Sequence, residues 1–234
     1  MNGNPEAPEG RGADRRAIPQ RSTRWATRIA DLLARTGLTP NKISVLSLVF
    51  AVVAAVALLG TVTTSPGLRA LLLAIAMCAI PLRLLCNMLD GMLAVEHGLH
   101  SPAGDLFNEV PDRIADVLVL AAAGYAAAGL WMVGGHDGGV ALGWSAATLA
   151  LLTAYVRALG AANGVGNFFA GPMAKPHRMW VIVAACAVTL LEAPLGWPQG
   201  IVLLVALAVV AVGSVVTVIL RLGLIVRALR GASS

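Results

Sequence analysis

Six of the twelve acidic residues of this chain lie in one 30-residue window, at the junction of two apolar segments of membrane length. Ionised side chains near a bilayer are costly and are retained mainly where they serve a function. We therefore expect the chemistry of this protein in that window. Its acidic residues are Asp90, Glu96, Asp105, Glu109, Asp112 and Asp116.

Helical periodicity places polar and small residues of the window on two stripes that face each other across a helical hairpin. The Gly and Ala positions carry almost no side chain, so the two backbones can approach closely or a flat ligand can enter between them. The first stripe comprises Asn87, Asp90, Gly91 and Ala94, and the second comprises Gly104, Asn108 and Asp112.

The oxygen-bearing side chains of the two stripes suit a hard divalent cation such as Mg²⁺ or Mn²⁺, which would leave positions for substrate phosphates. The alternative is that the polar residues only make hydrogen bonds between the helices, with the small residues serving packing alone. Such contacts need one or two polar groups, and the acids and amides of this window exceed that number. The metal site is therefore favoured.

The composition is that of a polytopic integral membrane protein. Hydrophobic residues make up 58% of the chain and charged residues 12%, with a mean hydropathy of +0.79, against roughly 25% charged residues in soluble domains. The net charge of +5 is explained by basic groups that face lipid, and nothing indicates nucleic-acid binding.

We expect an all-α fold of six transmembrane helices, each about 20 residues long to cross ~30 Å of hydrocarbon. Thr39-Pro40 and Ser101-Pro102 supply caps for the first and third helices. A disordered tail (1–20) and an interfacial amphipathic helix (21–38) precede the membrane domain (39–226), and a cytoplasmic tail (227–234) follows it. The expected spans are 42–61, 68–94, 105–132, 140–161, 179–193 and 200–223.

Positive charges set the orientation. The N-terminal region through Lys42 holds eight of the 17 Lys and Arg residues, and Lys175 and Arg178 lie between the fourth and fifth spans. The alternate loops contain no Lys or Arg, so the positive-inside rule places both termini in the cytoplasm. The acidic window then lies on the cytoplasmic side, and we expect the membrane to be a bacterial cell membrane.

The window resembles the motif of the CDP-alcohol phosphotransferases, which have six membrane helices. That motif reads Asp-x-x-Asp-Gly-x-x-Ala-Arg, eight or nine residues, then Gly-x-x-x-Asp-x-x-x-Asp. This chain matches its spacing, with Asn87 and Asn108 at the first and third Asp positions and Val95 at the Arg position. As neutral amides, the two Asn leave the site two negative charges poorer.

The resemblance implies transfer of a substituted phosphate, from a CDP-activated lipid or alcohol to a small alcohol acceptor, with release of CMP. It implies that Asp90 ligates the metal, that Asp112 is the general base, and that Gly91, Ala94 and Gly104 admit the cytidine diphosphate. It also implies a homodimer among membrane lipids.

Glu109 is the residue that we expect to replace a missing aspartate. It is adjacent to Asn108, and its longer side chain can reach round the helix. We hypothesise that Glu109 restores one negative charge to a site with a single Mg²⁺, whose other ligands are Asp90, Asn87 and Asn108. Asp105 is explained instead as a favourable charge at a helix start.

The basic residues near the window allow two interpretations each. Arg83 lies one helical turn before Asn87 and either binds a phosphate or balances the charge of Asp90 or Asp112. Lys175 and Arg178 either hold a phosphate of the acceptor or serve membrane topology.

The sequence leaves two other functions open. One is a catalytically degenerate relative that binds lipid or nucleotide without turnover. The other is a small cation- or proton-coupled transporter that uses the same acids, although the last three spans contain almost no polar residues for a path across the membrane.

Overall fold

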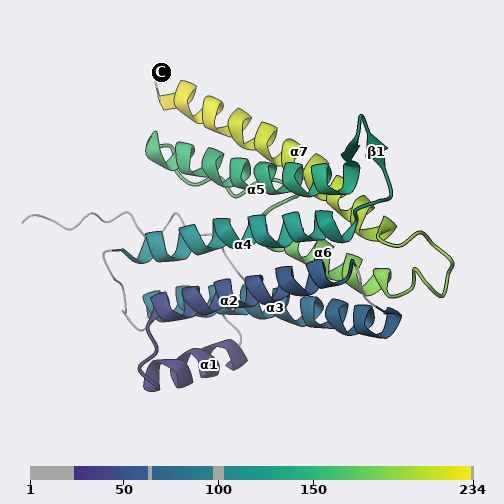
Figure 1. Cartoon of the computed structure of the whole chain (residues 1–234). Helices are drawn as coiled ribbons and strands as arrows, with labels where there is room; N and C mark the ends of the chain where they lie inside the picture. Colours follow the sequence, from purple (N-terminus) through teal and green to yellow (C-terminus); the bar gives the residue numbers. More distant parts are fainter. Residues whose placement is uncertain (1–23, 63–64, 97–102, 233–234) are drawn as a thin grey trace, which may run out of the picture.

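The computed structural model describes residues 24–62, 65–96 and 103–232, and these are mostly helical (Figure 1). One helix lies at each of the six predicted spans, and another lies within the predicted N-terminal helix. The predicted tail (1–20) and the Ser101-Pro102 cap lie outside the described residues. The helices are α1 (Arg24–Arg35), α2 (Pro40–Gly60), α3 (Pro66–Glu96), α4 (Gly104–Ala126), α5 (Gly138–Ala162), α6 (Lys175–Thr189) and α7 (Ile201–Ala232).

Four helices, namely α2, α3, α5 and α7, are long and apolar enough to cross a membrane. The other two predicted spans correspond to α4, which carries charged residues through its first half, and to α6, which has only 15 residues. The number of six spans therefore stays a prediction.

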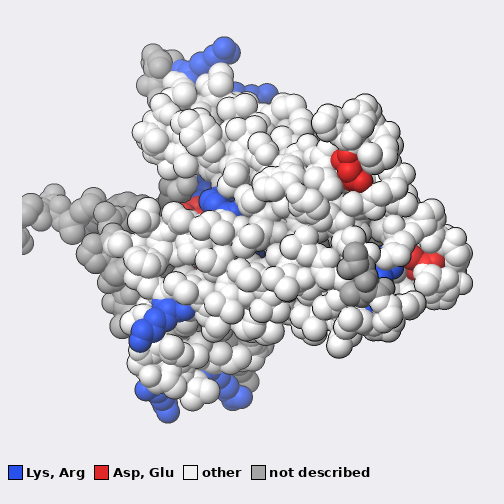
Figure 2. All heavy atoms as spheres, viewed as in Figure 1, with Lys and Arg blue, Asp and Glu red and all other residues white. Residues whose placement is uncertain are grey.

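Apolar side chains cover the outward faces of α2 and α7. Val56 and Val212, for example, are 62% and 66% exposed, and the face drawn in Figure 2 is almost free of charge along the middle of the bundle. Continuous apolar surface of this extent requires an apolar environment. Together with the four apolar helices, it identifies an integral membrane protein.

The long helices run side by side as a bundle (Figure 1). The helix α2 packs against both α3 and α4, α5 packs against α4 and α7, and α6 packs against α3 and α7. The short helix α1 lies at the edge of the bundle against α3. The carboxyl end of α3 and the amino end of α4 lie at the same end of the bundle, so the fold brings the two halves of the acidic window together.

The helices α4 and α5 cross at close range. A Cβ atom added to Gly124 would lie 2.8 Å from both the Gly139 carbonyl oxygen and the Gly143 Cα atom. Only glycine permits this approach, because any side chain would overlap backbone atoms. The contact joins the end of α4 to the start of α5, and towards the other end of the same two helices Arg157 of α5 meets Glu109 of α4.

The predicted boundaries differ most from the structure in two places. The third span was expected to reach residue 132, but α4 ends at Ala126, and the chain then forms a hairpin of β1 (Met132–Val133) and β2 (His136–Asp137). The reason is that Gly134 and Gly135 both have positive φ, as a two-residue hairpin turn requires. In the second place α7 continues to Ala232, over most of the expected C-terminal tail.

The predicted cap of the first span is confirmed. The Thr39 hydroxyl accepts a hydrogen bond from the Lys42 backbone N–H at 3.4 Å, and Pro40 is the first helical residue. The N-cap position of α4 is Ala103, whose side chain makes no capping hydrogen bond.

Candidate active site

The first carboxylate of the candidate site is Asp90, near the end of α3. Its side chain is buried, with 2% of the residue exposed. One carboxylate oxygen, Oδ2, accepts a hydrogen bond from the Ser44 hydroxyl of α2 at 2.7 Å. The other oxygen, Oδ1, is buried without a hydrogen-bond partner among the described residues. Because an unpartnered buried oxygen is costly, it indicates a place for a ligand.

The second carboxylate, Asp112 on α4, binds groups from two other helices. The Asn87 side-chain amide of α3 donates to Oδ1 at 2.5 Å, and the Lys175 ammonium of α6 pairs with Oδ2. Arg83 lies 3.5 Å from Oδ1. Asp90 lies three residues after Asn87 on α3 and therefore on the same face of that helix. Side chains of α3, α4 and α6 thus meet at Asp112.

One turn deeper, Asp116 forms ion pairs that hold three helices together. Arg83 of α3 and Arg178 of α6 approach its two oxygens at 2.9 and 2.8 Å, and all three side chains are almost fully buried. Arg178 also donates to the Thr153 hydroxyl of α5 at 3.1 Å. Of the two interpretations of Arg83, charge balance is the one that these contacts favour.

At the edge of the cluster, Glu109 of α4 pairs with two arginines. Its oxygens lie 2.9 Å from Arg113 and 2.5 Å from Arg157 of α5, and its side chain is 45% exposed. The Arg157 guanidinium also stacks over the Phe169 ring, 5.6 Å from its centroid. Figure 2 shows basic and acidic atoms at the surface between α4 and α5. Both oxygens of the proposed replacement ligand are therefore engaged by arginines.

The remaining predicted residues lie on the same two helices. Asn108 is exposed on α4, whereas Gly91, Ala94 and Gly104 are half-buried near the helix ends. The helices α3 and α4 are not among the closely packed pairs, since α2 packs against both. Of the two uses predicted for the small residues, entry of a ligand fits this arrangement better than backbone contact. The side chain of Asp105 lies outside the described residues.

The donor set fits one hard cation. Among the described residues, no group of three or more His, Cys, Asp or Glu side chains is placed to hold a metal. Asp90 offers its unpartnered oxygen. Asn87 uses its amide nitrogen on Asp112, which leaves its amide oxygen as the atom that can ligate. Oxygen ligands of this kind, completed by water or substrate phosphates, suit Mg²⁺ or Mn²⁺.

Two buried polar residues of this region were not predicted from the sequence. Ser44 is one, because the apolar pattern of α2 indicates which face is buried but not that Ser44 contacts Asp90. Arg221 is another: it lies in the apolar helix α7 and donates to the backbone carbonyls of Thr153 at 2.7 Å and Ala170 at 2.9 Å. An arginine within an apolar helix was the available signal.

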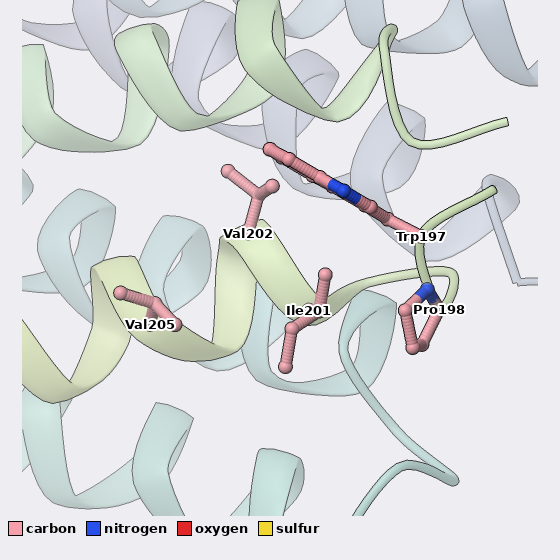
Figure 3. A pocket seen from close by; sticks show the side chains of 5 residues that line it. All are labelled: Trp197, Pro198, Ile201, Val202 and Val205. Atoms are coloured by element: carbon pink, nitrogen blue, oxygen red, sulfur yellow. The ribbon is translucent and has the colours of Figure 1, made fainter. Parts of the chain in front are cut away.

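A separate apolar pocket lies at the opposite end of the bundle, at the start of α7 (Figures 1 and 3). Its volume is about 460 Å³ and no charged side chain lines it. It is therefore remote from the acidic cluster in both position and chemistry. Its lining residues are Trp197, Pro198, Ile201, Val202 and Val205.

No protein-family model matches the sequence, and no curated protein sequence matches it. Solved structures do. The phosphatidylinositol phosphate synthase PgsA1 of Mycobacterium tuberculosis, with CDP-DAG bound, aligns over 87% of this chain and 94% of its own, at 23% identity and a TM-score of 0.64. The same enzyme with manganese and citrate aligns over 86% and 88%, at 25% identity and a TM-score of 0.64. Its apo form aligns over 84% and 93%, at 25% identity and a TM-score of 0.60.

These similarities show a shared fold over most of both chains. PgsA1 is a CDP-alcohol phosphotransferase, which agrees with the enzyme class that the motif spacing predicts, a transferase of substituted phosphate groups. The agreement is independent of the motif, because the comparison rests on the course of the whole backbone.

Proposed function

We propose that this protein is a membrane phosphotransferase of phospholipid synthesis. It transfers a substituted phosphate, in our proposal the phosphatidyl group, from a CDP-activated lipid to an alcohol and releases CMP. The observation that carries the proposal is the convergence of Asp90 and Asp112, both buried, at one end of a bundle that shares its fold with an enzyme solved with CDP-DAG.

A divalent cation, Mg²⁺ or Mn²⁺, would be held by Asp90 with the amide oxygens of Asn87 and Asn108. The PgsA1 structure with manganese supports this choice of metal. When bound, the cation would neutralise the diphosphate and stabilise the charge that develops on the departing CMP. Glu109 stays a proposed ligand, on the condition that it leaves Arg113 or Arg157.

Asp112 is the proposed general base. It would take the proton of the acceptor hydroxyl, whose oxygen then forms the new bond to the lipid-side phosphorus while the bond from phosphorus to CMP breaks. Asn87 and Lys175 donate to the Asp112 carboxylate and so hold it in one orientation. Such orientation matters because a general base must lie within hydrogen-bond distance of the proton that it removes.

Lys175 is also the best placed of the predicted basic residues to bind substrate phosphate, since it is half-buried and lies beside Asp112. Arg83 and Arg178 are fully buried and form ion pairs with Asp116. We propose that their positive charges attract a substrate phosphate without direct contact. The cytidine diphosphate would lie along Gly91, Ala94 and Gly104. We further propose cytoplasmic termini, an active site on the cytoplasmic side and a homodimer.

The test is incubation of the purified protein in lipid with CDP-diacylglycerol, Mg²⁺ and a panel of alcohols and alcohol phosphates. We expect CMP to appear with at least one acceptor. Binding of CDP-diacylglycerol without CMP release from any acceptor would favour the non-catalytic relative, which the neutral Asn87 and Asn108 make the second candidate.

A further inference from the structure

The polar cluster contains more positive than negative charge in its described side chains. Five cations face four carboxylates, although the site is proposed to bind both a divalent cation and a diphosphate. The carboxylates belong to Asp90, Glu109, Asp112 and Asp116, and the cations to Arg83, Arg113, Arg157, Lys175 and Arg178.

Three of the four carboxylates already have cationic partners from the chain itself. Arg83 and Arg178 approach Asp116, Arg113 and Arg157 approach Glu109, and Lys175 approaches Asp112. Asp90 differs from these three. Among the described contacts it has only the Ser44 hydroxyl, and its Oδ1 is the one carboxylate oxygen of the cluster that is buried without a partner.

The Asn87 amide adds to this difference between Asp112 and Asp90. Asn87 donates to Asp112, which a carboxylate at position 87 could not do without a proton. Asp112 therefore has a hydrogen-bond donor on Oδ1 and an ammonium on Oδ2, whereas Asp90 is the carboxylate that offers an oxygen without a partner.

We propose that the Lys175 ammonium supplies the positive charge at Asp112 and excludes a metal ion from that carboxylate, so that the site binds a single divalent cation centred on Asp90. This inference rests on the proposed function and specifies its metal requirement. Lysine suits the role because its ammonium is a compact point charge with three donors on a flexible stem. A second divalent cation beside it would be repelled strongly, since the interior screens charge poorly.

The test is the number of Mn²⁺ ions bound per chain, measured by equilibrium dialysis and metal analysis of purified protein in detergent without substrate. We expect one ion for the wild-type protein, none for Asp90→Asn and one for Lys175→Arg, which keeps the positive charge. We expect two ions for the triple variant Asn87→Asp, Asn108→Asp, Lys175→Met, which supplies two carboxylates and removes the ammonium.

Two or zero ions on the wild-type protein would overturn the proposal, and so would one ion on the triple variant when its elution and helical circular dichroism match those of the wild type. If the triple variant does not fold, the wild-type protein still decides whether the site binds one divalent cation. A second ion on Lys175→Arg would also contradict the role of the charge.

The outcome is distinguishable from failure of the proposed function. One Mn²⁺ per chain without CMP release from any acceptor would refute the enzyme and keep the single-cation site. CMP release with two Mn²⁺ per chain would keep the enzyme and refute the role of Lys175.

Discussion

Two buried ionic clusters lie at opposite ends of the bundle, and they are built differently. At the end remote from the acidic window, Arg69 of α3 pairs with Glu192 at 3.0 Å. The same Glu192 accepts backbone N–H groups at the start of α7, from Gly200 at 2.8 Å and Val202 at 3.1 Å. Each Glu192 oxygen thus has a donor, and the carboxylate lies at a helix N-terminus, where negative charge is favourable.

The two ends show the difference between a structural ion pair and a ligand-binding site. Glu192 ties α7 to α3 and has no oxygen left for a ligand. Asp90 at the other end is equally buried but keeps one oxygen without a partner. Unpartnered guanidinium nitrogens occur at both ends, at Arg69 as well as at Arg83, so the open carboxylate oxygen of Asp90 is what sets the two ends apart. Leaving a buried oxygen unsatisfied costs stability, which indicates a place for a ligand at Asp90. The differences between these two ends can be tested by substitution.

The largest effect is expected at Asp112. Asp112→Asn should reduce CMP release by about 10²–10⁴-fold, the usual cost of removing a general base. Binding of CDP-diacylglycerol and the elution profile should stay unchanged, because the amide has the same shape. Turnover is measured as CMP formed per folded chain, and a rate close to that of the wild type would remove Asp112 from its assigned role.

The next largest effect is expected at Glu192, at the end of the bundle remote from the acidic window. Glu192→Ala should destabilise the protein by about 3–5 kcal/mol, because it leaves Arg69 buried and unpaired. Thermal unfolding in detergent measures this loss, while CMP release per folded chain should not change. Glu192→Gln is the matched control and should lose less, since it keeps an oxygen for the α7 backbone. A loss of turnover without loss of stability would contradict the division between the two ends.

A smaller effect is expected at the helix crossing that positions Arg157. Gly124→Ala places a methyl group 2.8 Å from backbone atoms of α5, and overpacking of this kind costs about 1–3 kcal/mol. Thermal unfolding again reports the change, with Gly67→Ala as the control, because a Cβ atom there meets nothing within 4 Å. Equal stability of the two variants would mean that α4 and α5 cross at a greater distance.

The smallest effect is expected at Glu109. Its two arginine pairs and its exposure lead us to expect that Glu109→Gln weakens Mn²⁺ binding by about tenfold or less, as for a partly exposed ion pair. Asp90→Asn should abolish binding, and Asp105→Asn should have little effect. Equal losses in Glu109→Gln and Asp90→Asn would show instead that Glu109 leaves its arginines to ligate the cation, as hypothesised from the sequence.

The sequence predicted the helices because they depend on local periodicity. Apolar runs of membrane length located α2 to α7, and the spacing of Asn87, Asp90 and Asp112 placed them where α3 faces α4. The expected Thr39 cap is present for the same reason, since capping involves residues three apart.

The long-range partners could not be predicted. Periodicity assigns Lys175 or Arg157 to a face of a helix, but it does not state which of several carboxylates that face meets. The choice between Glu109 and Asp112 depends on how α5 and α6 pack around α4, and that packing rests on non-local contacts such as Gly124 against Gly143. The hairpin after α4 was missed because the apolar run continues through Trp131 and Met132.

The most direct test of the central claim is the yield of both products from one reaction. The wild-type protein in lipid vesicles is given CDP-diacylglycerol labelled in its acyl chains, Mn²⁺ and the alcohol panel, and CMP and the new phospholipid are quantified together. Our account predicts equal molar amounts of the two products, dependent on Mn²⁺ and lost in Asp112→Asn. Absence of labelled phospholipid with every acceptor, from protein that binds CDP-diacylglycerol, would contradict it.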